Sequence, residues 1–180
     1  AGTETVLAIV AAGTGNDIAR ALHLPLCDAK AAAEVIANGV VRTIDVGRHT
    51  DGDGMPHWFV GVLGAGFDSV VNERANMWGW PKGPMRYNLA IARELPVFKP
   101  IPYVIEVDGV RHSTQAMLVA VGNGPSYGGG MQVCPDASFD DGMFDVLIVH
   151  KISTFEFLKV FPKVFTCDRK LPRPNSRPGP

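Results

Sequence analysis

The sequence changes its pattern near residue 42, and this change limits the folds that the chain can adopt. Before it, an apolar run at residues 5–10 meets a glycine-containing turn and two helix-forming stretches. After it, β-branched and alternating runs recur between Gly, Asp and Pro, which is typical of antiparallel strands. We therefore predict an incomplete α/β part over residues 1–42 and a mainly β part over residues 43–167.

The first part has the order strand, glycine turn, helix, helix. The apolar run at residues 5–10 predicts a strand, and the turn at residues 13–17 leads into a short helical stretch. A second, alanine-rich helix follows, with Asp28 as its predicted N-cap and Gly39 as its terminator. This order is half of an α/β unit.

The second part contains one predicted helix among predicted strands. The helix is expected over residues 87–95, where apolar residues have helical spacing, and Asp108–Gly109 predicts a hairpin turn. The strands are expected in five runs, at residues 40–49, 57–67, 102–112, 113–123 and 143–151.

Composition and charge exclude several classes of protein. Of 180 residues, 46% are hydrophobic, which is enough for a buried core, yet no apolar run approaches the roughly 20 residues of a membrane-spanning helix. The net charge is −1, but residues 168–180 hold four basic residues and one acid, which leaves −4 for the rest. We therefore expect no nucleic-acid binding, a cytoplasmic protein, and a disordered Pro-rich tail at residues 168–180.

The three cysteines indicate neither a disulfide framework nor a zinc site. Cys27, Cys134 and Cys167 are odd in number and widely spaced, and no CxxC pair occurs. We expect reduced thiols.

The turn GTGND at residues 13–17 has two interpretations. Glycines allow a ligand to approach the backbone, and a helix start favours a phosphate oxygen. The same residues also suit a purely structural connection. The spacing matches neither the Walker A motif nor GxGxxG, so those nucleotide pockets are not predicted.

The acidic turn near residue 140 also has two interpretations. Asp136, Asp140 and Asp141 place three carboxylates within six residues, and such oxygens can hold a hard cation such as Mg²⁺. A solvated turn with Asp-Gly at its corner accounts for the same residues.

Three segments in order resemble the diacylglycerol kinase catalytic domain family, which includes bacterial lipid kinases and sphingosine kinases. They are AAGTGNDIARALHLP at residues 11–25, GVLGAGFDSVVNE at residues 61–73 and MLVAVGNGPSYGGGMQVCPDASFDDGMFDVLIV at residues 117–149. Ala11 departs from the family pattern, which has proline there. The resemblance implies the C-terminal part of a nucleotide-binding α/β domain followed by an antiparallel β-sandwich-like domain.

The resemblance also implies a reaction and its residues. ATP would give its γ-phosphoryl group to a lipid hydroxyl, turning diacylglycerol into phosphatidic acid. Asp17 would be catalytic, near Mg²⁺. The ATP-binding residues would be Gly13, Thr14, Gly15 and Asn16. The metal ligands would be the Asp141 carboxylate and the backbone carbonyls of Ser138 and Met143.

The implied partner is a lipid substrate at a membrane surface, and the protein would attach peripherally at the inner membrane face. Whether it forms a homodimer is left undecided by the sequence. The loop at residues 77–83 pairs two tryptophans with Lys82, which is compatible with a membrane interface. Trp58 is expected in the core, and the histidines at the surface.

Two family motifs fall outside this sequence. The phosphate-gripping GGDGT segment would precede residue 1, and a DGE segment with the catalytic base would follow residue 180. Together with the Pro- and Arg-rich tail, this predicts a fragment or frameshifted product that is inactive by itself. The alternatives are a kinase for a sphingoid base or a phosphatidylinositol-type acceptor, or a remnant without catalysis that binds nucleotide, metal or nothing.

Overall fold

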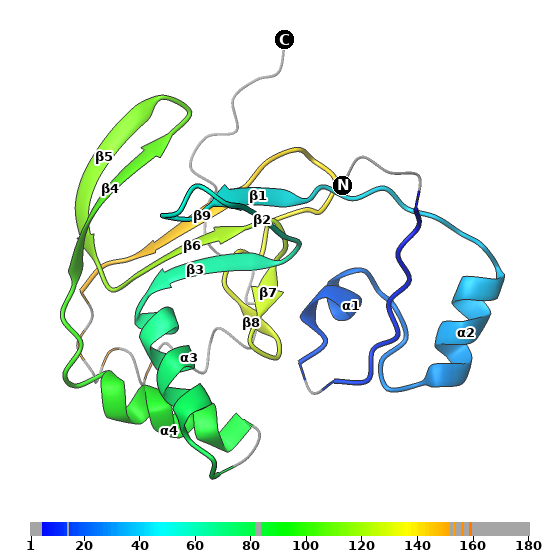
Figure 1. The fold of residues 1–180 in the computed structure, drawn as a ribbon, viewed down its shortest axis with the longest axis horizontal. Coiled ribbons are helices and arrows are strands. Elements are labelled where there is room, and N and C mark those ends of the chain that lie inside the picture. Colours follow the sequence, from blue (N-terminus) through cyan, green and yellow to red (C-terminus); the bar gives the residue numbers. More distant parts are fainter. Residues whose placement is uncertain are drawn as a thin grey trace.

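The computed structural model describes residues 5–13, 15–81 and 84–151, together with residues 153, 156 and 159 (Figure 1). Thr14 and the tail at residues 168–180 lie outside these residues. The elements, in chain order, are α1 (Asp17–Ala21), α2 (Ala29–Ala37), β1 (Gly47–Thr50), β2 (Pro56–Phe59), β3 (Val62–Gly66), α3 (Phe67–Met77), α4 (Pro84–Glu94), β4 (Ile101–Val107), β5 (Val110–Ala116), β6 (Leu118–Gly122), β7 (Ser126–Tyr127), β8 (Met131–Gln132) and β9 (Asp145–Val149).

Antiparallel pairing organises the second part, as predicted. A three-stranded sheet has the order β3-β6-β9, and every residue of β6 pairs with both neighbouring strands. Three two-stranded units surround it: β1-β2, β4-β5 and β7-β8. The strands predicted at residues 57–67 and 113–123 are each divided in the structure, because the chain turns at residues 60–61 and again at Met117.

The predicted hairpin at Asp108–Gly109 is confirmed. Both residues have positive φ, 51° and 78°, which is the geometry of a two-residue turn that matches the twist of its strands. β4 and β5 pair over their full length on either side of it, from Val107 with Val110 to Ile101 with Ala116.

The main core lies between α3, α4 and the junction of β5 with β6. Its buried residues are Phe67, Val71, Ala75, Ala90, Ile91, Leu95 and Met117. The sequence predicts α4 but not α3, although the α3 core residues follow helical spacing. A partly buried ion pair from Arg74 Nε to Glu94 Oε1, at 2.7 Å, also joins the two helices.

The second helix of the first part forms as predicted. The carboxylate of Asp28 accepts a hydrogen bond from the Ala31 amide, at 3.0 Å, which caps the start of α2. Gly39 follows the last turn with φ of 65°, the left-handed conformation that ends helices.

The predicted strand at residues 5–10 does not form. Among the described residues, the nearest β-bridge is a single parallel one from Ala11, just after this stretch, to Leu26. Val6 and Leu7 are largely exposed. A strand is stable only when neighbouring strands take up its backbone groups, and no strand of the described residues pairs with this run.

The prediction that Trp58 lies in the core is wrong. The side chain is 55% exposed on β2, where the guanidinium of Arg48 lies 6.0 Å from the ring centroid. The alternation of β2 decides this, because Phe59 points inward and stacks on Phe144 while its neighbour points outward.

Among the described residues, no helix has the length and apolar character needed to cross a membrane.

Candidate functional site

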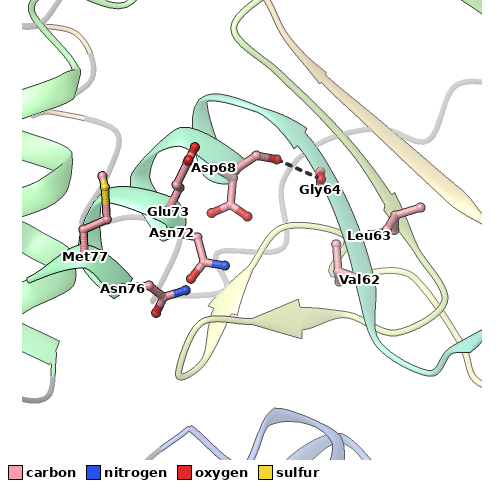
Figure 2. Close-up of a pocket in the computed structure, with 9 residues that line it drawn as sticks. Val62, Leu63, Gly64, Asp68, Asn72, Glu73, Asn76 and Met77 are labelled. Atoms are coloured by element: carbon pink, nitrogen blue, oxygen red, sulfur yellow. Dashed lines mark hydrogen bonds between the residues drawn. The ribbon is translucent and has the colours of Figure 1, made fainter. Parts of the chain in front are cut away.

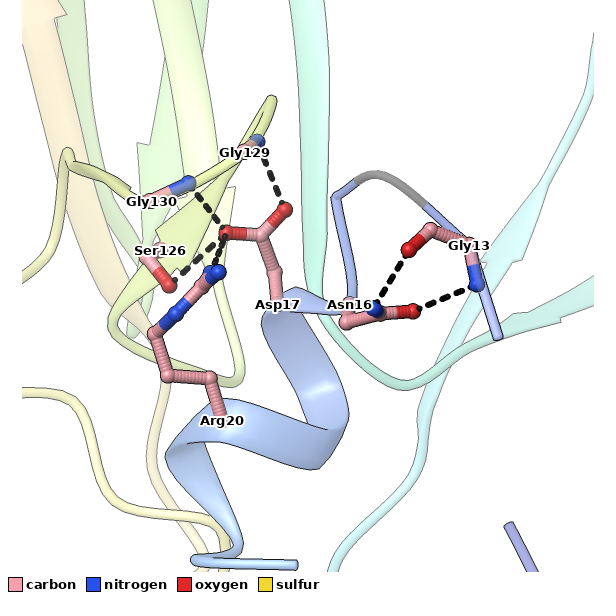
Figure 3. Close-up of polar contacts among 7 residues, drawn as sticks. All are labelled: Gly13, Asn16, Asp17, Arg20, Ser126, Gly129 and Gly130. Carbon is pink, nitrogen blue, oxygen red and sulfur yellow. Dashed lines mark hydrogen bonds and ion pairs between the residues drawn. The ribbon is translucent and has the colours of Figure 1, made fainter. Parts of the chain in front are cut away.

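The carboxylate of Asp17 joins the two parts of the chain. It lies in the first turn of α1 and accepts hydrogen bonds from the Gly129 amide at 2.8 Å and the Gly130 amide at 2.6 Å (Figure 3). Ser126 Oγ donates to Asp17 Oδ1 at 3.2 Å, and Arg20 Nη1 lies 3.4 Å from the same oxygen. These five residues form the Asp17 cluster, which brings the GTGND and GGG motifs together.

The conformation of the glycine turn makes these bonds possible. Gly129 and Gly130 have φ of 91° and 105°, a region that other residues rarely adopt, and this turns both amides toward Asp17. A carboxylate held by two amides is a strong, charge-assisted contact. The side chain of Asp17 is only 15% exposed, so its charge serves this contact rather than facing solvent.

Asn16 closes the GTGND turn from inside. Its backbone is left-handed, with φ of 55°, and its side chain accepts from the Gly13 amide at 3.1 Å and donates to the Gly13 carbonyl at 2.6 Å. The Gly13 amide is therefore engaged within the turn. Gly15 lies beside Gly129. Thr14 lies outside the described residues, so ATP binding by these four residues stays a prediction.

A second carboxylate lies on the other side of β7. The side chain of Asp68, in the first turn of α3, accepts a hydrogen bond from the Tyr87 hydroxyl, and Tyr127 also faces it. Burial, together with the negative charge of Asp68, raises the pKa of both tyrosines far above the ordinary value. Both hydroxyls therefore stay protonated and act as donors.

An open pocket of about 640 Å³ begins at Asp68 (Figure 2). β3 forms one wall with Val62 and Gly64, and the polar face of α3 forms the other. The α3 residues of the lining are Asp68, Ser69, Asn72, Glu73, Asn76 and Met77. Such a pocket combines hydrogen-bonding groups near Asp68 with an apolar end at Met77.

The acidic turn does not gather three carboxylates. Asp140 pairs with Arg42 at 2.7 Å and accepts from Ser138 Oγ at 2.6 Å; these contacts, the serine bond first, lower its pKa. Across the described residues, no three side chains of His, Cys, Asp or Glu are placed to hold a metal ion. The interpretation of Asp136, Asp140 and Asp141 as a three-carboxylate site is therefore not supported.

The smaller metal set stays a prediction. Asp141 Oδ1 accepts from the Met143 amide at 3.0 Å, and the Gly142 amide donates to Asp45 Oδ2 at 2.7 Å. These bonds fix the turn without using the carbonyl oxygens of Ser138 and Met143. One carboxylate and two carbonyls are hard oxygen donors, so the chemistry of this set is compatible with Mg²⁺.

Sequence reasoning missed the partners of both carboxylates. Ser126 and Tyr127 are consecutive in β7, and they contact Asp17 and Asp68 respectively. The Gly-Phe-Asp segment at residues 66–68 belongs to the family resemblance, but the sequence gives its acid no role. The available signal was the position of Asp68, which closely follows a glycine at the end of an apolar run.

Two family models match this chain. The model of the diacylglycerol kinase catalytic domain matches residues 1–49, and the model of the YegS C-terminal NAD kinase beta sandwich-like domain matches residues 61–169. The chain belongs to the diacylglycerol kinase family. The predicted fold class, an α/β portion followed by a β-sandwich-like domain, agrees with these two matches.

Relatives in the diacylglycerol kinase family extend beyond this sequence. The diacylglycerol kinase of Mycobacterium tuberculosis is 43% identical over 166 residues, covering 92% of this chain and 54% of the relative. That of Bacillus subtilis is 34% identical over 155 residues, covering 86% and 50%. The chain thus spans about half the length of these curated relatives.

Solved structures agree with this assignment. A crystal structure of a putative diacylglycerol kinase from Bacillus anthracis is similar with a TM-score of 0.62 and 26% identity, covering 90% of this chain and 52% of that one. A second structure of a diacylglycerol kinase from the same organism has a TM-score of 0.57 and 27% identity, covering 88% and 48%.

Proposed function

We propose that the protein to which this chain belongs transfers the γ-phosphoryl group of ATP to the hydroxyl of diacylglycerol. The acceptor oxygen forms a bond to the γ-phosphorus, and the bond from that phosphorus to the oxygen bridging it to the β-phosphorus breaks. ADP leaves with the electron pair, the hydroxyl proton passes to a base, and phosphatidic acid is formed. Membership of the diacylglycerol kinase family supports this reaction class.

The observation that carries the proposal is the Asp17 cluster. Phosphoryl transfer depends on positioning and on charge stabilisation more than on covalent chemistry. Asp17 fixes the glycine turn at residues 128–130 against the GTGND turn across 112 positions of sequence. In this proposal Asp17 holds the two glycine-containing segments in the arrangement that nucleotide phosphates require, and Gly13, Thr14, Gly15 and Asn16 face those phosphates.

The pocket at Asp68 is the proposed acceptor site. The carboxylate of Asp68, held by the Tyr87 hydroxyl, can accept a hydrogen bond from the lipid hydroxyl, and the amides of Asn72 and Asn76 can contact a polar headgroup. Two carboxylates in the lining, Asp68 and Glu73, also favour a second candidate, the cationic headgroup of a sphingoid base. Acceptor choice is therefore tested directly.

Magnesium belongs to the proposal in two places. With ATP it would neutralise phosphate charge during transfer. At the acidic turn it would be held by the Asp141 carboxylate and the carbonyls of Ser138 and Met143. Mg²⁺ is then expected to raise the unfolding midpoint of the 180-residue chain, because a ligand that binds the native state stabilises it. Asp141→Ala should abolish this increment, and equal midpoints in Mg²⁺ and in EDTA would contradict the turn site.

The kinase proposal is tested with radiolabelled ATP. The assay compares the 180-residue chain with a chimera that adds the remaining N- and C-terminal segments of the Mycobacterium tuberculosis relative. Diacylglycerol, sphingosine and a lipid-free sample are the acceptors, all in detergent micelles. The chimera is expected to label diacylglycerol.

The matched variants of the chimera are Asp17→Asn and His112→Ala. Asp17→Asn should lower turnover on the order of 10²-fold, because the glycine turn loses its charged anchor. The exposed His112, in contrast, should be dispensable. Labelling of sphingosine alone would mean that the acceptor is a sphingoid base and not diacylglycerol. Full activity of Asp17→Asn would contradict the positioning role proposed for the Asp17 cluster.

A further inference from the structure

The outer face of α4 and the neighbouring end of α3 expose large apolar side chains. Met85 and Leu89 are 60% and 43% exposed, and Ala92 continues their row at helical spacing. Met77, at the end of α3, is 65% exposed, and Trp80, in the connection that follows, is 79% exposed. Met77, Trp80, Met85 and Leu89 together are called the tip surface. Figure 1 shows this end of α3 and α4 projecting away from the sheets.

The charges beside the apolar row of α4 are cationic, while the exposed Glu73 lies one helical turn before Met77 on α3. Arg86 and Arg93 flank the apolar row of α4 on one side by helical geometry. Arg86 donates to the Trp78 carbonyl at 2.8 Å, while no hydrogen bond or ion pair holds Arg93 within the part of the chain that the structure describes. The acid of α4, Glu94, is buried against Arg74 and adds no exposed negative charge.

Other exposed apolar segments have a different charge pattern. The hairpin of β4 and β5 exposes Val104 and Val110, but Glu106, Asp108 and Arg111 lie among them, so both signs are present. The apolar residues at 5–10 are aliphatic and have no basic residue beside them. Met55 and Trp58 of the β1-β2 unit are exposed, and Arg48 lies beside Trp58, but Asp51 and Asp53 lie in the same unit. Among these described segments, the tip surface therefore offers the Trp, Met and Leu side chains with flanking arginines that suit the boundary between lipid headgroups and acyl chains.

We propose that the tip surface docks on an anionic phospholipid bilayer, with Trp80, Met77, Met85 and Leu89 at the acyl boundary and Arg86 and Arg93 among the headgroups. This inference rests on the proposed function, because a diacylglycerol acceptor resides in a bilayer. The tip surface would contact the lipid and would set the orientation of the chain at the bilayer.

The pocket supports this orientation. Met77 belongs both to the tip surface and to the pocket lining, at the opposite end of α3 from Asp68 (Figure 2). Docking through Met77 therefore places the apolar end of the pocket at the bilayer. A lipid could then extend its headgroup along the polar face of α3 toward Asp68 while its acyl chains stay in the membrane.

The test measures binding of the 180-residue chain to vesicles without ATP. Sedimentation with phosphatidylcholine vesicles that contain or lack phosphatidylglycerol gives the partition coefficient. The parent chain should bind the anionic vesicles more tightly. The double variant Trp80→Ser with Leu89→Gln should bind them roughly tenfold more weakly, because two apolar side chains leave the acyl boundary. Arg93→Gln should weaken binding about fivefold on anionic vesicles and leave neutral vesicles unaffected.

The matched control is Trp58→Ser, because Trp58 is also an exposed tryptophan but lies on β2. Its binding should equal that of the parent chain. Every substitution is at an exposed position, so unfolding midpoints should be unchanged; if the double variant is destabilised, Met85→Gln takes its place. Equal vesicle binding by the parent chain and the tip variants, or a loss of binding only in Trp58→Ser, would overturn the inference.

Two further outcomes distinguish bilayer docking from self-association and from the kinase reaction. A dimer detected by light scattering without vesicles, and lost in the double variant, would mean that a second copy covers the tip surface, which also overturns the inference. Phosphoryl transfer in the detergent assay does not need a bilayer. Normal vesicle binding without transfer would therefore reject the kinase proposal alone, and transfer in micelles without vesicle binding would reject the tip surface alone.

Discussion

The regions at residues 5–46 and 47–149 use apolar residues differently. In the first, Leu7 and Val40 are more than four-fifths exposed, and among its described side chains only the small ones of Ala11, Ala19 and Ala32 are buried. In the second, helices pack on each other and on a sheet around a core in which Val71 and Ala90 are fully buried. An apolar run is thus buried only where a second apolar surface faces it, and composition does not provide that surface.

The first region is held to the second mainly by polar contacts. The Asp17 cluster attaches α1, and the Arg42–Asp140 pair and the bond from Gly142 to Asp45 attach the connecting segment. Such contacts fix geometry without adding a core. We therefore expect the second region to carry the cooperative stability of the chain, and the first to open at lower free energy.

The largest expected effect follows from Gly66→Ala in the second region. Gly66 precedes α3 with φ of 100°, and an added Cβ would lie 2.5 Å from the Met117 carbonyl oxygen. Strain and overlap should lower the free energy of unfolding by about 3 kcal/mol. Urea unfolding followed by circular dichroism measures this, with Gly52→Ala as the control in open space. Equal stability in the two variants would mean that Gly66 is not closely packed against Met117.

The second prediction compares the reactivity of one cysteine thiol in each region. Cys134 is buried in the second region, and burial, followed by the charge of Asp145, raises its pKa to about 11. At about pH 8 its thiolate fraction is then on the order of 10²-fold below that of an ordinary thiol. Cys27 is exposed in the first region. Peptide mass spectrometry during iodoacetamide labelling should show Cys27 modified first, and labelling of both thiols at one rate would break the distinction.

Asp17→Asn should release the first region from the second. The amide keeps an acceptor but loses the charge that Gly129 and Gly130 contact, so the opening free energy at these amides should fall by about 2 kcal/mol. Native-state hydrogen exchange measures this. Asp28→Asn is the control, because asparagine also caps helices. Unchanged protection at Gly129 and Gly130 would show that other contacts hold the turn.

The smallest effect is expected at the surface pair of Arg42 and Asp140. The bond from Ser138, followed by Arg42, lowers the pKa of Asp140 below its ordinary value of 3.8. A depressed native pKa adds stability above 3.8, and this contribution disappears as the pH falls through the lowered value. Unfolding of Asp140→Asn should therefore differ slightly from the parent chain at neutral pH and converge with it in acid. A difference that grows in acid would reverse the sign of this prediction.

The sequence predicted features whose cause is local. The hairpin at Asp108–Gly109, the cap at Asp28 and the terminator Gly39 each depend on the conformations that one or two residue types favour, so neighbouring residues were sufficient. Antiparallel strands followed from alternating runs between turn residues. The GTGND and GGG motifs were also visible, because glycine in such turns is a chemical requirement.

The tertiary structure decided which of these segments meet. Nothing local in Asp17 indicates that its partners are Ser126, Gly129 and Gly130, because the contact depends on the long-range folding that places β7 beside α1. The same long-range folding pairs Asp140 with Arg42 and places Asp68 in the lining of a pocket. It also leaves the run at residues 5–10 without a paired strand. Residue types determined what chemistry was available, and long-range packing determined where it was placed, since proximity in space is fixed by the whole chain.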